Sequence, residues 1–334
     1  MSKTEARTIT IAIELGDALA FRADVLALKY AQSSYGLDAY VVERLYQAGQ
    51  DITRLLPEVG KFRLVDPRGQ FGFQSVLFVG VEPLNKFGYP EIRKFGLNVL
   101  ASLADAAPKT RHVCVTIHGT GYGLDEAESF ESEIAGFLDA VDAGELPAAL
   151  ERITIIDANT ARVGRLRRIL SQLLPGGQVT LDITGNVEAL GGTSTARLRL
   201  AGSATDSKPN IFVAMPFSDD MDDTFHYGIQ NAVNAAGYLC ERADLSSFTG
   251  DVMEYVKSRI ASASLVIADL STANPNVYLE VGYAWGSGKR TVLLVRDPEE
   301  LKFDVKGQRC LVYKKIKDLE EALRRELEAL QRPQ

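Results

Sequence analysis

Residues 264–289, SLVIADLSTANPNVYLEVGYAWGSGK, join a short apolar run to a helix through a polar turn. The apolar run is typical of a strand covered on both faces of a parallel sheet, and Asp269 lies at its carboxyl end. Asn274 before Pro275 predicts a helix N-cap and a first helical residue, so Glu280 falls in the early turns of that helix. Two carboxylates are therefore expected at the carboxyl edge of one sheet, where open α/β sheets bind ligands.

The spacing within this helix predicts which side chains face the core and which face a cleft. Val277, Val281, Ala284 and Trp285 recur at core spacing, whereas Glu280, Tyr283 and Ser287 share a neighbouring face. The alternative interpretation is that Glu280 only complements the helix dipole, as acidic residues near helix N-termini commonly do.

These residues resemble a known family. The run NIFVAMPF at 210–217, the stretch quoted above and FDV at 303–305 look like the nucleoside 2-deoxyribosyltransferase-like group, which neighbours the TIR-like NAD-cleaving domains. The resemblance covers about residues 208–316. Its most specific part is an acidic strand end, a polar turn and E-x-G-x-A, matched by Glu280, Gly282 and Ala284.

The resemblance implies a catalytic role for both acids. Glu280 would attack the anomeric carbon of a nucleoside, and Asp269 would position or protonate the base. The other implied substrate-binding residues are Met215, Pro216, Phe217, Asn274, Asn276 and Tyr283. Transferases of this group often carry an aspartate and a Gly-Thr pair ahead of the glutamate, and this chain does not. The departure leaves room for another N-glycosidic substrate, such as NAD.

The composition of the 334 residues narrows the class of protein. A hydrophobic content of 46% and a charged content of 24% are typical of a globular chain long enough for two domains. The net charge of -7 argues against a partner held by the phosphates of duplex DNA. The three cysteines and three histidines lack metal-ligand spacing, so no metal is expected. No apolar run is long enough for a membrane span or a signal core, so we expect a cytoplasmic protein.

The first half of the chain reads as an α/β domain with mixed strand directions. Apolar patterns predict strands at 8–15, 25–31, 61–65, 75–81, 113–118 and 152–158, with helices at 36–50, 89–107 and 159–174. The helix at 159–174 carries a basic face of Arg162, Arg165, Arg167 and Arg168. We interpret that face as a solvated surface, and contact with an acidic partner is the alternative.

A glycine-rich turn follows the strand at 113–118. Its residues are Gly119, Thr120, Gly121, Tyr122 and Gly123. Glycines at a strand-to-helix turn allow backbone N–H groups to approach a phosphate. The arrangement resembles a macro domain, the ADP-ribose-binding fold, and loosely the N-terminal domain of leucine aminopeptidases. An ordinary turn is the alternative, because the nearby acids Asp125, Glu126 and Glu128 would repel a phosphate unless they point away.

The predicted organisation is a macro-like mixed-sheet α/β domain at 1–175, a Gly-, Ser- and Thr-rich connection at 176–208, and a doubly wound, flavodoxin-like parallel-sheet domain at 209–334. Strands alternating with helices predict the parallel sheet of the second domain. Within 176–208 we expect at most short strands, at 178–183 and 195–200.

The predicted function is cleavage of an N-glycosidic bond in NAD or a nucleoside or deoxynucleotide, with no cofactor required. A carboxylate stabilises the oxocarbenium-like sugar, and Glu280 suits that role because a helix N-terminus should keep it ionised. An ADP-ribose-like ligand in the first domain would regulate this cleavage. Such a pairing of domains resembles bacterial antiphage defence proteins, which commonly assemble to become active, so we also expect a homo-oligomer. The alternative is a non-catalytic nucleotide sensor that switches an assembly.

Overall fold

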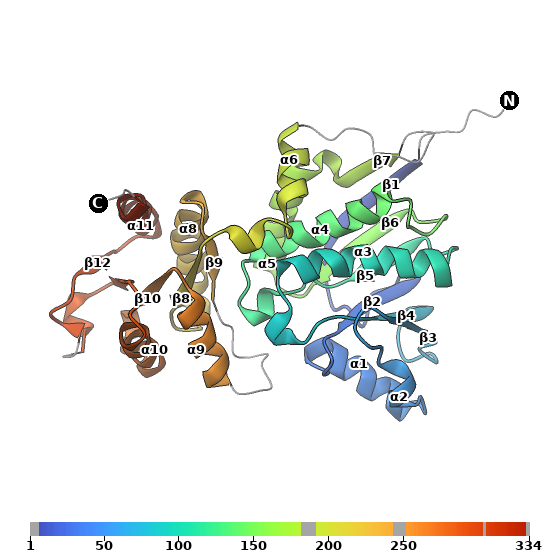
Figure 1. The fold of residues 1–334 in the computed structure, drawn as a ribbon, viewed down its shortest axis with the longest axis horizontal. Helices are drawn as coiled ribbons and strands as arrows, with labels where there is room; N and C mark the ends of the chain where they lie inside the picture. The colour runs from blue at the N-terminus through green and yellow to red at the C-terminus, as the bar shows by residue number, and fades with distance from the viewer. Residues whose placement is uncertain (1–6, 182–191, 243–251, 303–304, 332–334) are drawn as a thin grey trace. The chain divides into compact units, whose positions relative to one another are not determined.

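The computed structural model describes residues 7–181, 192–242, 252–302 and 305–331 (Figure 1). The chain divides into two compact units. The first comprises Met1–Thr120 and Glu126–Asp206, and the second comprises Gly121–Asp125 and Ser207–Gln334. No helix in the described part of the chain is both long and apolar enough to cross a membrane.

Within the described residues, the first unit contains a mixed sheet of seven strands in the order β3-β4-β2-β5-β6-β1-β7. Five central strands are parallel, and β3 and β7 pair antiparallel at the two edges. The strands are β1 Arg7–Leu15, β2 Val25–Tyr30, β3 Phe62–Val65, β4 Ser75–Gly80, β5 His112–Val115, β6 Arg152–Asp157 and β7 Gln178–Leu181. The strands predicted at 61–65 and 75–81 are present as β3 and β4, and they pair antiparallel.

The helices of the first unit pack around this sheet. They are α1 Gly36–Gln47, α2 Ile52–Leu55, α3 Tyr89–Ala106, α4 Glu126–Asp142, α5 Thr160–Leu173 and α6 Gly192–Leu200. Helix α1 buries Val41 and Leu45 against side chains of β2 and β4. Helices α3 and α4 lie side by side in Figure 1 and approach closely at two glycines. A Cβ built at Gly136 would lie 1.9 Å from the Arg93 carbonyl oxygen, and one at Gly96 would lie 2.7 Å from the Glu133 carbonyl oxygen.

The segment predicted as a connection is partly regular structure. Residues 178–181 form β7, as the prediction of a short strand at 178–183 requires, although residues beyond 181 lie outside the described part. The predicted strand at 195–200 is wrong, because these residues belong to α6. In α6, Leu198 is buried, the residues on either side of it are exposed, and Arg197 donates a hydrogen bond to the buried Glu131 carboxylate.

The second unit contains, among the described residues, an all-parallel sheet of five strands in the order β12-β11-β10-β8-β9. The strands are β8 Asn210–Ala214, β9 Leu239–Glu241, β10 Leu265–Asp269, β11 Thr291–Val295 and β12 Cys310–Val312. If the strands of this unit are renumbered from 1 to 5 in chain order, their order across the sheet, from β9 to β12, is 2-1-3-4-5. This is the flavodoxin-like doubly wound arrangement. The predicted fold class of both domains is confirmed.

Helices cover both faces of the second sheet. Successive side chains of β8 from Ile211 to Ala214 point to opposite faces and all of them are apolar, so both faces must be covered. Ile211 and Val213 pack into a core with α8 and α11, whereas Phe212 and Ala214 pack into another core with α9 and α10. The helices are α7 Asp219–Asp223, α8 Asn231–Ala235, α9 Val252–Ser262, α10 Pro275–Gly286 and α11 Ile316–Gln331. A π-helical segment, Thr224–Gln230, joins α7 to α8, so the helical type changes along this stretch.

Two expectations about α10 differ in outcome. Val277, Val281 and Ala284 are buried in the core, as predicted. Trp285, predicted on the same face, is instead 39% exposed, because consecutive helical residues are rotated by about 100°, slightly more than a quarter turn, and Trp285 directly follows the buried Ala284.

Candidate functional site

The carboxyl edge of the second sheet carries a row of chemically active side chains. Across the edge the residues at or just beyond the strand ends are Tyr313, Arg296, Asp269, Met215 and Arg242, in the order β12, β11, β10, β8 and β9. From β8 the chain proceeds to β9 on one side, and from β10 it proceeds to β11 on the other. The crevice between β8 and β10 is therefore the topological switch point, where doubly wound sheets bind ligands.

Asp269 is fully buried at this edge, with 0% of its surface exposed. Its Oδ2 accepts a hydrogen bond of 2.6 Å from the Tyr313 hydroxyl, and its Oδ1 accepts one of 2.9 Å from the Ser271 backbone N–H. Burial raises the pKa of Asp269, and these hydrogen bonds with the nearby Arg296 partly oppose that rise. Asp269 thus holds protein groups in place, and its direct contact with a base or sugar stays a prediction.

Arg296 connects this network to the segment after β8. Its backbone N–H donates to the Ser271 hydroxyl at 2.9 Å, and its guanidinium donates to the Tyr313 hydroxyl at 3.3 Å and to the Thr224 hydroxyl at 3.0 Å. Tyr313 hydrogen-bonds a buried carboxylate, and burial together with Asp269 raises the pKa of Tyr313 to about 12. The strand ends of β10, β11 and β12 are therefore joined by one polar network.

The turn between β10 and α10 is strained and capped. Thr272 and Ala273 have φ angles of 70° and 48°, in the left-handed region that residues other than glycine rarely adopt. The Asn274 side chain accepts a hydrogen bond from the Asn276 backbone N–H at 2.9 Å, with Pro275 at the first helical position. The predicted N-cap is confirmed, and it gives Asn274 a local structural role in addition to any contact with substrate.

Glu280 lies on α10 beside the buried core residues and is itself half-buried. Among the described residues, none donates a hydrogen bond to its carboxylate or forms an ion pair with it. Burial raises the pKa of Glu280 from 4.5 to about 7. The expectation that the helix N-terminus keeps this group fully ionised is therefore wrong, because loss of water outweighs the helix dipole here. Convergence of Glu280 and Asp269 on one pocket stays a prediction.

The other predicted substrate residues divide into buried and exposed groups. Met215 and Pro216 are buried at the exit from β8, whereas Phe217 is exposed. Tyr283 is half-buried and packs against the α9–α10 core. Sequence reasoning missed Arg242, whose guanidinium carbon lies 4.8 Å from the Phe217 ring centroid and 4.0 Å from that of Phe225. The signal available was its position one residue beyond β9.

The glycine-rich turn has glycines in the left-handed backbone conformation, and two of its carbonyl groups already accept hydrogen bonds from the protein. Gly119 and Gly123 have φ angles of 89° and 84°, which glycine adopts without strain. Residues 121–125 belong to the second unit. The Tyr122 carbonyl accepts from the Tyr255 hydroxyl, and the Gly123 carbonyl accepts from the Arg242 backbone N–H at 3.1 Å. Phosphate binding by this turn stays a prediction.

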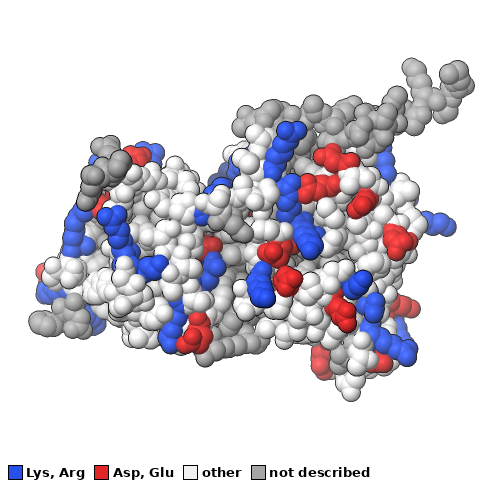
Figure 2. Space-filling view, viewed as in Figure 1, with Lys and Arg blue, Asp and Glu red and all other residues white. Residues whose placement is uncertain are grey.

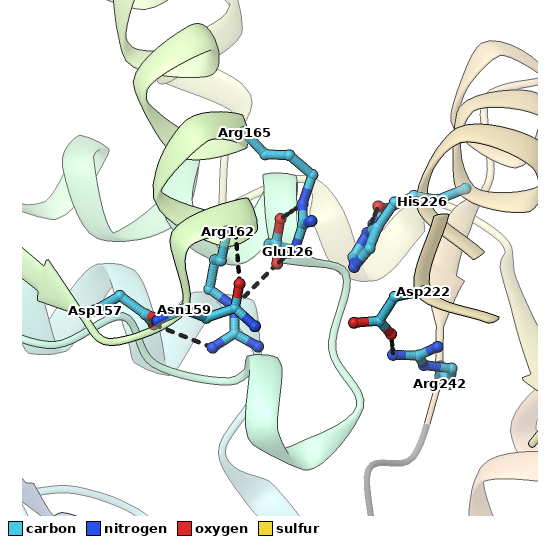
Figure 3. Close-up of polar contacts among 9 residues, drawn as sticks. Glu126, Asp157, Asn159, Arg162, Arg165, Asp222, His226 and Arg242 are labelled. Atoms are coloured by element: carbon cyan, nitrogen blue, oxygen red, sulfur yellow. Dashed lines mark hydrogen bonds and ion pairs between the residues drawn. The ribbon is translucent and has the colours of Figure 1, made fainter. Parts of the chain in front are cut away.

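The acidic residues that follow the turn are paired within the protein. Glu126 accepts hydrogen bonds from Arg165 at 2.6 and 2.9 Å and from Arg162 at 3.1 Å (Figure 3). Along the same helix, Glu128 accepts from Thr205, Glu131 pairs with Arg197, and Glu133 pairs with His118. These four carboxylates are buried, and each has a hydrogen-bond partner on a neighbouring segment.

The interpretation of the α5 arginines as a solvated face needs correction. Arg162 also donates to Asp157 at 3.1 Å (Figure 3). Arg167 donates to the Ile13 carbonyl at 3.0 Å. Three of the four arginines therefore bind groups within the first unit. Figure 2 shows basic and acidic side chains interspersed on the visible face of that unit, which fits such local pairing.

No family model matches this chain, and no curated protein matches its sequence. Among solved structures, a macrodomain of Oceanobacillus iheyensis with ADP is similar over 51% of this chain and 98% of its own, with 12% identity and a TM-score of 0.37. A mutant of the same macrodomain with ADPR is similar over 48% and 92%, with 16% identity and a TM-score of 0.37. The N-terminal half is similar to macrodomains. The resemblance of the second unit to deoxyribosyltransferases and TIR-like domains gains no support from these comparisons.

Proposed function

We propose that the second unit cleaves the N-glycosidic bond of a nucleotide, NAD or a deoxynucleotide, with Glu280 as the catalytic carboxylate. The observation that carries the proposal is the state of Glu280: half-buried, without a partner among the described residues, and with its pKa raised to about 7. A carboxyl group that is costly to ionise in the folded protein, near the ligand-binding edge of a doubly wound sheet, is typical of a catalytic group.

The chemistry explains why such a group is useful. Cleavage of an N-glycosidic bond develops positive charge on the sugar, and a carboxylate in a poorly solvated site stabilises that charge more strongly than one in water. Approach of a cationic sugar also favours the ionised form of Glu280, so the group becomes a better nucleophile when substrate is bound. With nicotinamide as the leaving group, little protonation of the base is needed.

In the proposed mechanism, Asp269 and Tyr313 do not react with the substrate. They hold Glu280 in position. Asp269 fixes the Tyr313 hydroxyl and the turn that leads into α10, and Tyr313 in turn accepts from Arg296. Loss of that network would shift the start of α10 and thereby Glu280. This differs from the role implied by the family resemblance, in which the aspartate contacts the base.

We further propose that the glycine turn at residues 119–123 binds an ADP-ribose-like nucleotide, and that this binding regulates the second unit. The support is the left-handed backbone at Gly119 and Gly123 after a central parallel strand. A homo-oligomeric antiphage effector, as the family resemblance implies, is the biological setting that we propose.

The enzymatic proposal is tested with purified protein, NAD and a panel of deoxynucleotides, with and without ADP-ribose. Free base is quantified by chromatography for the wild-type chain, for Glu280→Gln and for Glu321→Gln, an exposed glutamate on α11 as the matched control. We expect base release that falls at least 100-fold in Glu280→Gln and is unchanged in Glu321→Gln. Absence of base release from every substrate under every condition refutes the proposal.

A non-catalytic nucleotide sensor is the second candidate. It is favoured by the burial of Asp269, which leaves Glu280 without an accessible second acid from that strand end. Calorimetry separates the two functions, since a sensor retains intact ligand at a fixed stoichiometry and an enzyme returns free base.

A further inference from the structure

The outer strand of the second sheet, β12, has an open edge. It pairs with β11 on one side, and no described strand pairs with its other side (Figure 1). The Tyr313 N–H donates to the Val295 carbonyl, and backbone groups along a strand alternate between its two sides. The N–H and C=O groups of Cys310 and Val312 therefore point away from β11. No described residue hydrogen-bonds these outward groups, so they can pair with an extended segment of another chain.

The side chains along this edge are apolar. Val312 is 52% exposed, and the three residues of β12 are cysteine, leucine and valine. A cavity of about 220 Å³, lined also by Arg309 just before the strand, lies between Trp285, Leu293 and Leu311. Small-molecule sites typically measure about 300–1,000 Å³, so this cavity suits a single large apolar side chain better. Trp285 is of a residue type that often carries binding energy at interfaces.

The segment that contains β12 is strongly basic. Residues 305–317 include no acidic residue, although the whole chain has a net charge of -7. Figure 2 shows Lys and Arg side chains gathered at this end of the second unit. The segment's exposed cations that form no ion pair with a described residue are Lys306, Lys314, Lys315 and Lys317. Its arginine, Arg309, donates to Glu326 at 2.8 and 2.7 Å. In the sequence, uncompensated positive charge therefore lies on both sides of the open strand.

Lysines at a sheet edge can also serve only to prevent aggregation, which they do by placing charge on the edge strand. Here the cations lie before and after β12, and the strand between them remains apolar and open. A second copy of this chain is a poor occupant, because pairing β12 with itself in either direction brings cations of both copies to the same ends. An acidic segment instead meets favourable charge at both ends.

We infer that β12 binds an extended acidic segment of a partner protein, which adds a strand to the second sheet. The backbone groups of Cys310 and Val312 supply the hydrogen bonds, and one apolar or aromatic side chain of the partner enters the cavity beside Trp285. Acidic residues on either side of that side chain pair with the lysines. The inference does not rest on the proposed catalysis, which depends on Glu280.

The test begins with a selection that needs no known partner. A phage-displayed library of random 12-residue peptides is selected on the full-length protein, with soluble full-length Val312→Pro protein as competitor. Proline removes the outward N–H of Val312 and is tolerated in edge strands whose N–H faces solvent. We expect the enriched peptides to carry Asp or Glu on both sides of a short run of β-branched or aromatic residues.

Selected peptides are then synthesised, and their binding is followed by the fluorescence of Trp285, the only tryptophan in the chain. Val312→Pro should weaken binding 10-fold or more. Val312→Thr keeps the N–H and the branched side chain, and should change the affinity less than 3-fold. Urea unfolding compares the stability of the two variants.

Charge reversal tests the surface without changing the strand. Lys314→Glu combined with Lys315→Glu should weaken binding of the acidic peptides 10-fold or more. Raising the salt concentration from 50 to 500 mM should weaken their binding to the wild-type protein, because salt screens exposed charges. Lys86→Glu combined with Lys109→Glu, at two exposed lysines of the first unit, makes the same change of net charge and should bind within 3-fold of wild type.

Three outcomes of the peptide experiments overturn the inference. They are no enrichment of peptides that prefer the wild-type protein to Val312→Pro, enrichment of neutral or basic peptides, and equal affinity of the wild-type and charge-reversed proteins. Light scattering tests a second copy as the occupant, and an oligomer that dissociates in Val312→Pro would also overturn the inference. Base release is measured separately, and its absence would refute the proposed catalysis without affecting this surface.

Discussion

At the scale of single residues, the chemistry of Glu280 depends on which of two effects controls its charge. The helix N-terminus favours the ionised carboxylate, typically by less than about 1 kcal/mol near a surface. Removal of water without a compensating donor opposes ionisation more strongly, and the pKa of Glu280 rises to about 7. The same carboxyl group therefore titrates in the range where it would work.

The pH dependence of catalysis follows from this value. If Glu280 acts as the ionised group, kcat/KM for base release should increase about tenfold per pH unit below pH 7 and level off above it. Rates measured from pH 5 to pH 9 at constant ionic strength check this. A profile that falls above pH 7 would instead assign Glu280 the role of a proton donor.

Glu280 should also reduce stability at the pH where it works. Its folded pKa lies above the ordinary 4.5, so the protonated form is favoured by folding. Its stabilising contribution is complete below about pH 4.5 and is lost as the pH rises to about 7. Glu280→Gln should therefore raise the free energy of unfolding at pH 8 by about 1–3 kcal/mol and have little effect at pH 4.5. Urea unfolding at both pH values tests this, and Glu321→Gln should change neither.

At the scale of elements, packing at helix and strand ends determines where the polar groups lie. Helices α3 and α4 come within backbone contact at Gly96 and Gly136, and this holds α4 and its four paired glutamates against the rest of the first unit. In the second unit, hydrogen bonds among Asp269, Tyr313 and Arg296 join three strand ends.

Gly136→Ala should disrupt the helix pair. The added methyl would lie 1.9 Å from the Arg93 carbonyl oxygen, which is backbone and cannot move aside without separating α3 from α4. We expect a loss of about 2–4 kcal/mol in the free energy of unfolding, typical of severe overpacking. Gly164→Ala on α5 is the matched control, since no atom lies within 4 Å of its Cβ and alanine favours the helix. It should be neutral or slightly stabilising in the same thermal and urea unfolding measurements.

Tyr313→Phe tests the network at the strand ends. It removes the 2.6 Å hydrogen bond to buried Asp269 and should cost about 1–3 kcal/mol at pH 7. Tyr227→Phe, at an exposed tyrosine, should cost less than about 0.5 kcal/mol. If Asp269 positions α10, Tyr313→Phe should lower kcat while leaving ligand affinity within about threefold. Equal stability of the two variants would contradict the role given to this hydrogen bond.

At the scale of the whole molecule, the chain enters the second unit twice. Residues 121–125 belong to that unit although they lie between β5 and α4 in the sequence. Within it, Asp125 accepts a hydrogen bond of 3.0 Å from the backbone N–H of buried Cys240, which lies in the edge strand β9. The second unit is therefore incomplete as residues 207–334 alone.

Asp125→Ala should weaken the second unit by leaving the Cys240 N–H without this acceptor. We expect a loss of about 1–3 kcal/mol and faster hydrogen exchange at the Cys240 amide. Asp105→Ala, at an exposed aspartate on α3, is the control. Unchanged exchange at Cys240 would show that the short segment contributes little to the unit.

Much of this architecture is readable from local patterns. The parallel sheet of the second unit follows from apolar runs alternating with helices, and the Asn274 cap follows from an Asn-Pro pair at a helix start. The strand assignment at 195–200 failed because a short segment of small and polar residues with one buried leucine has no clear period. The basic face of α5 was misread because its acidic partners lie on other elements.

The sequence alone determined the fold class of both units, the strand–turn–helix around residues 264–289 and the position of Glu280 along it, because hydrophobic period and helix-capping chemistry act over a few residues. Tertiary structure alone decided that Glu280 has a pKa near 7, that Asp269 is buried against Tyr313, and that Arg242 and Arg296 flank the switch point. Solvation and pairing of a charged group depend on residues distant in sequence, which only the folded chain brings together.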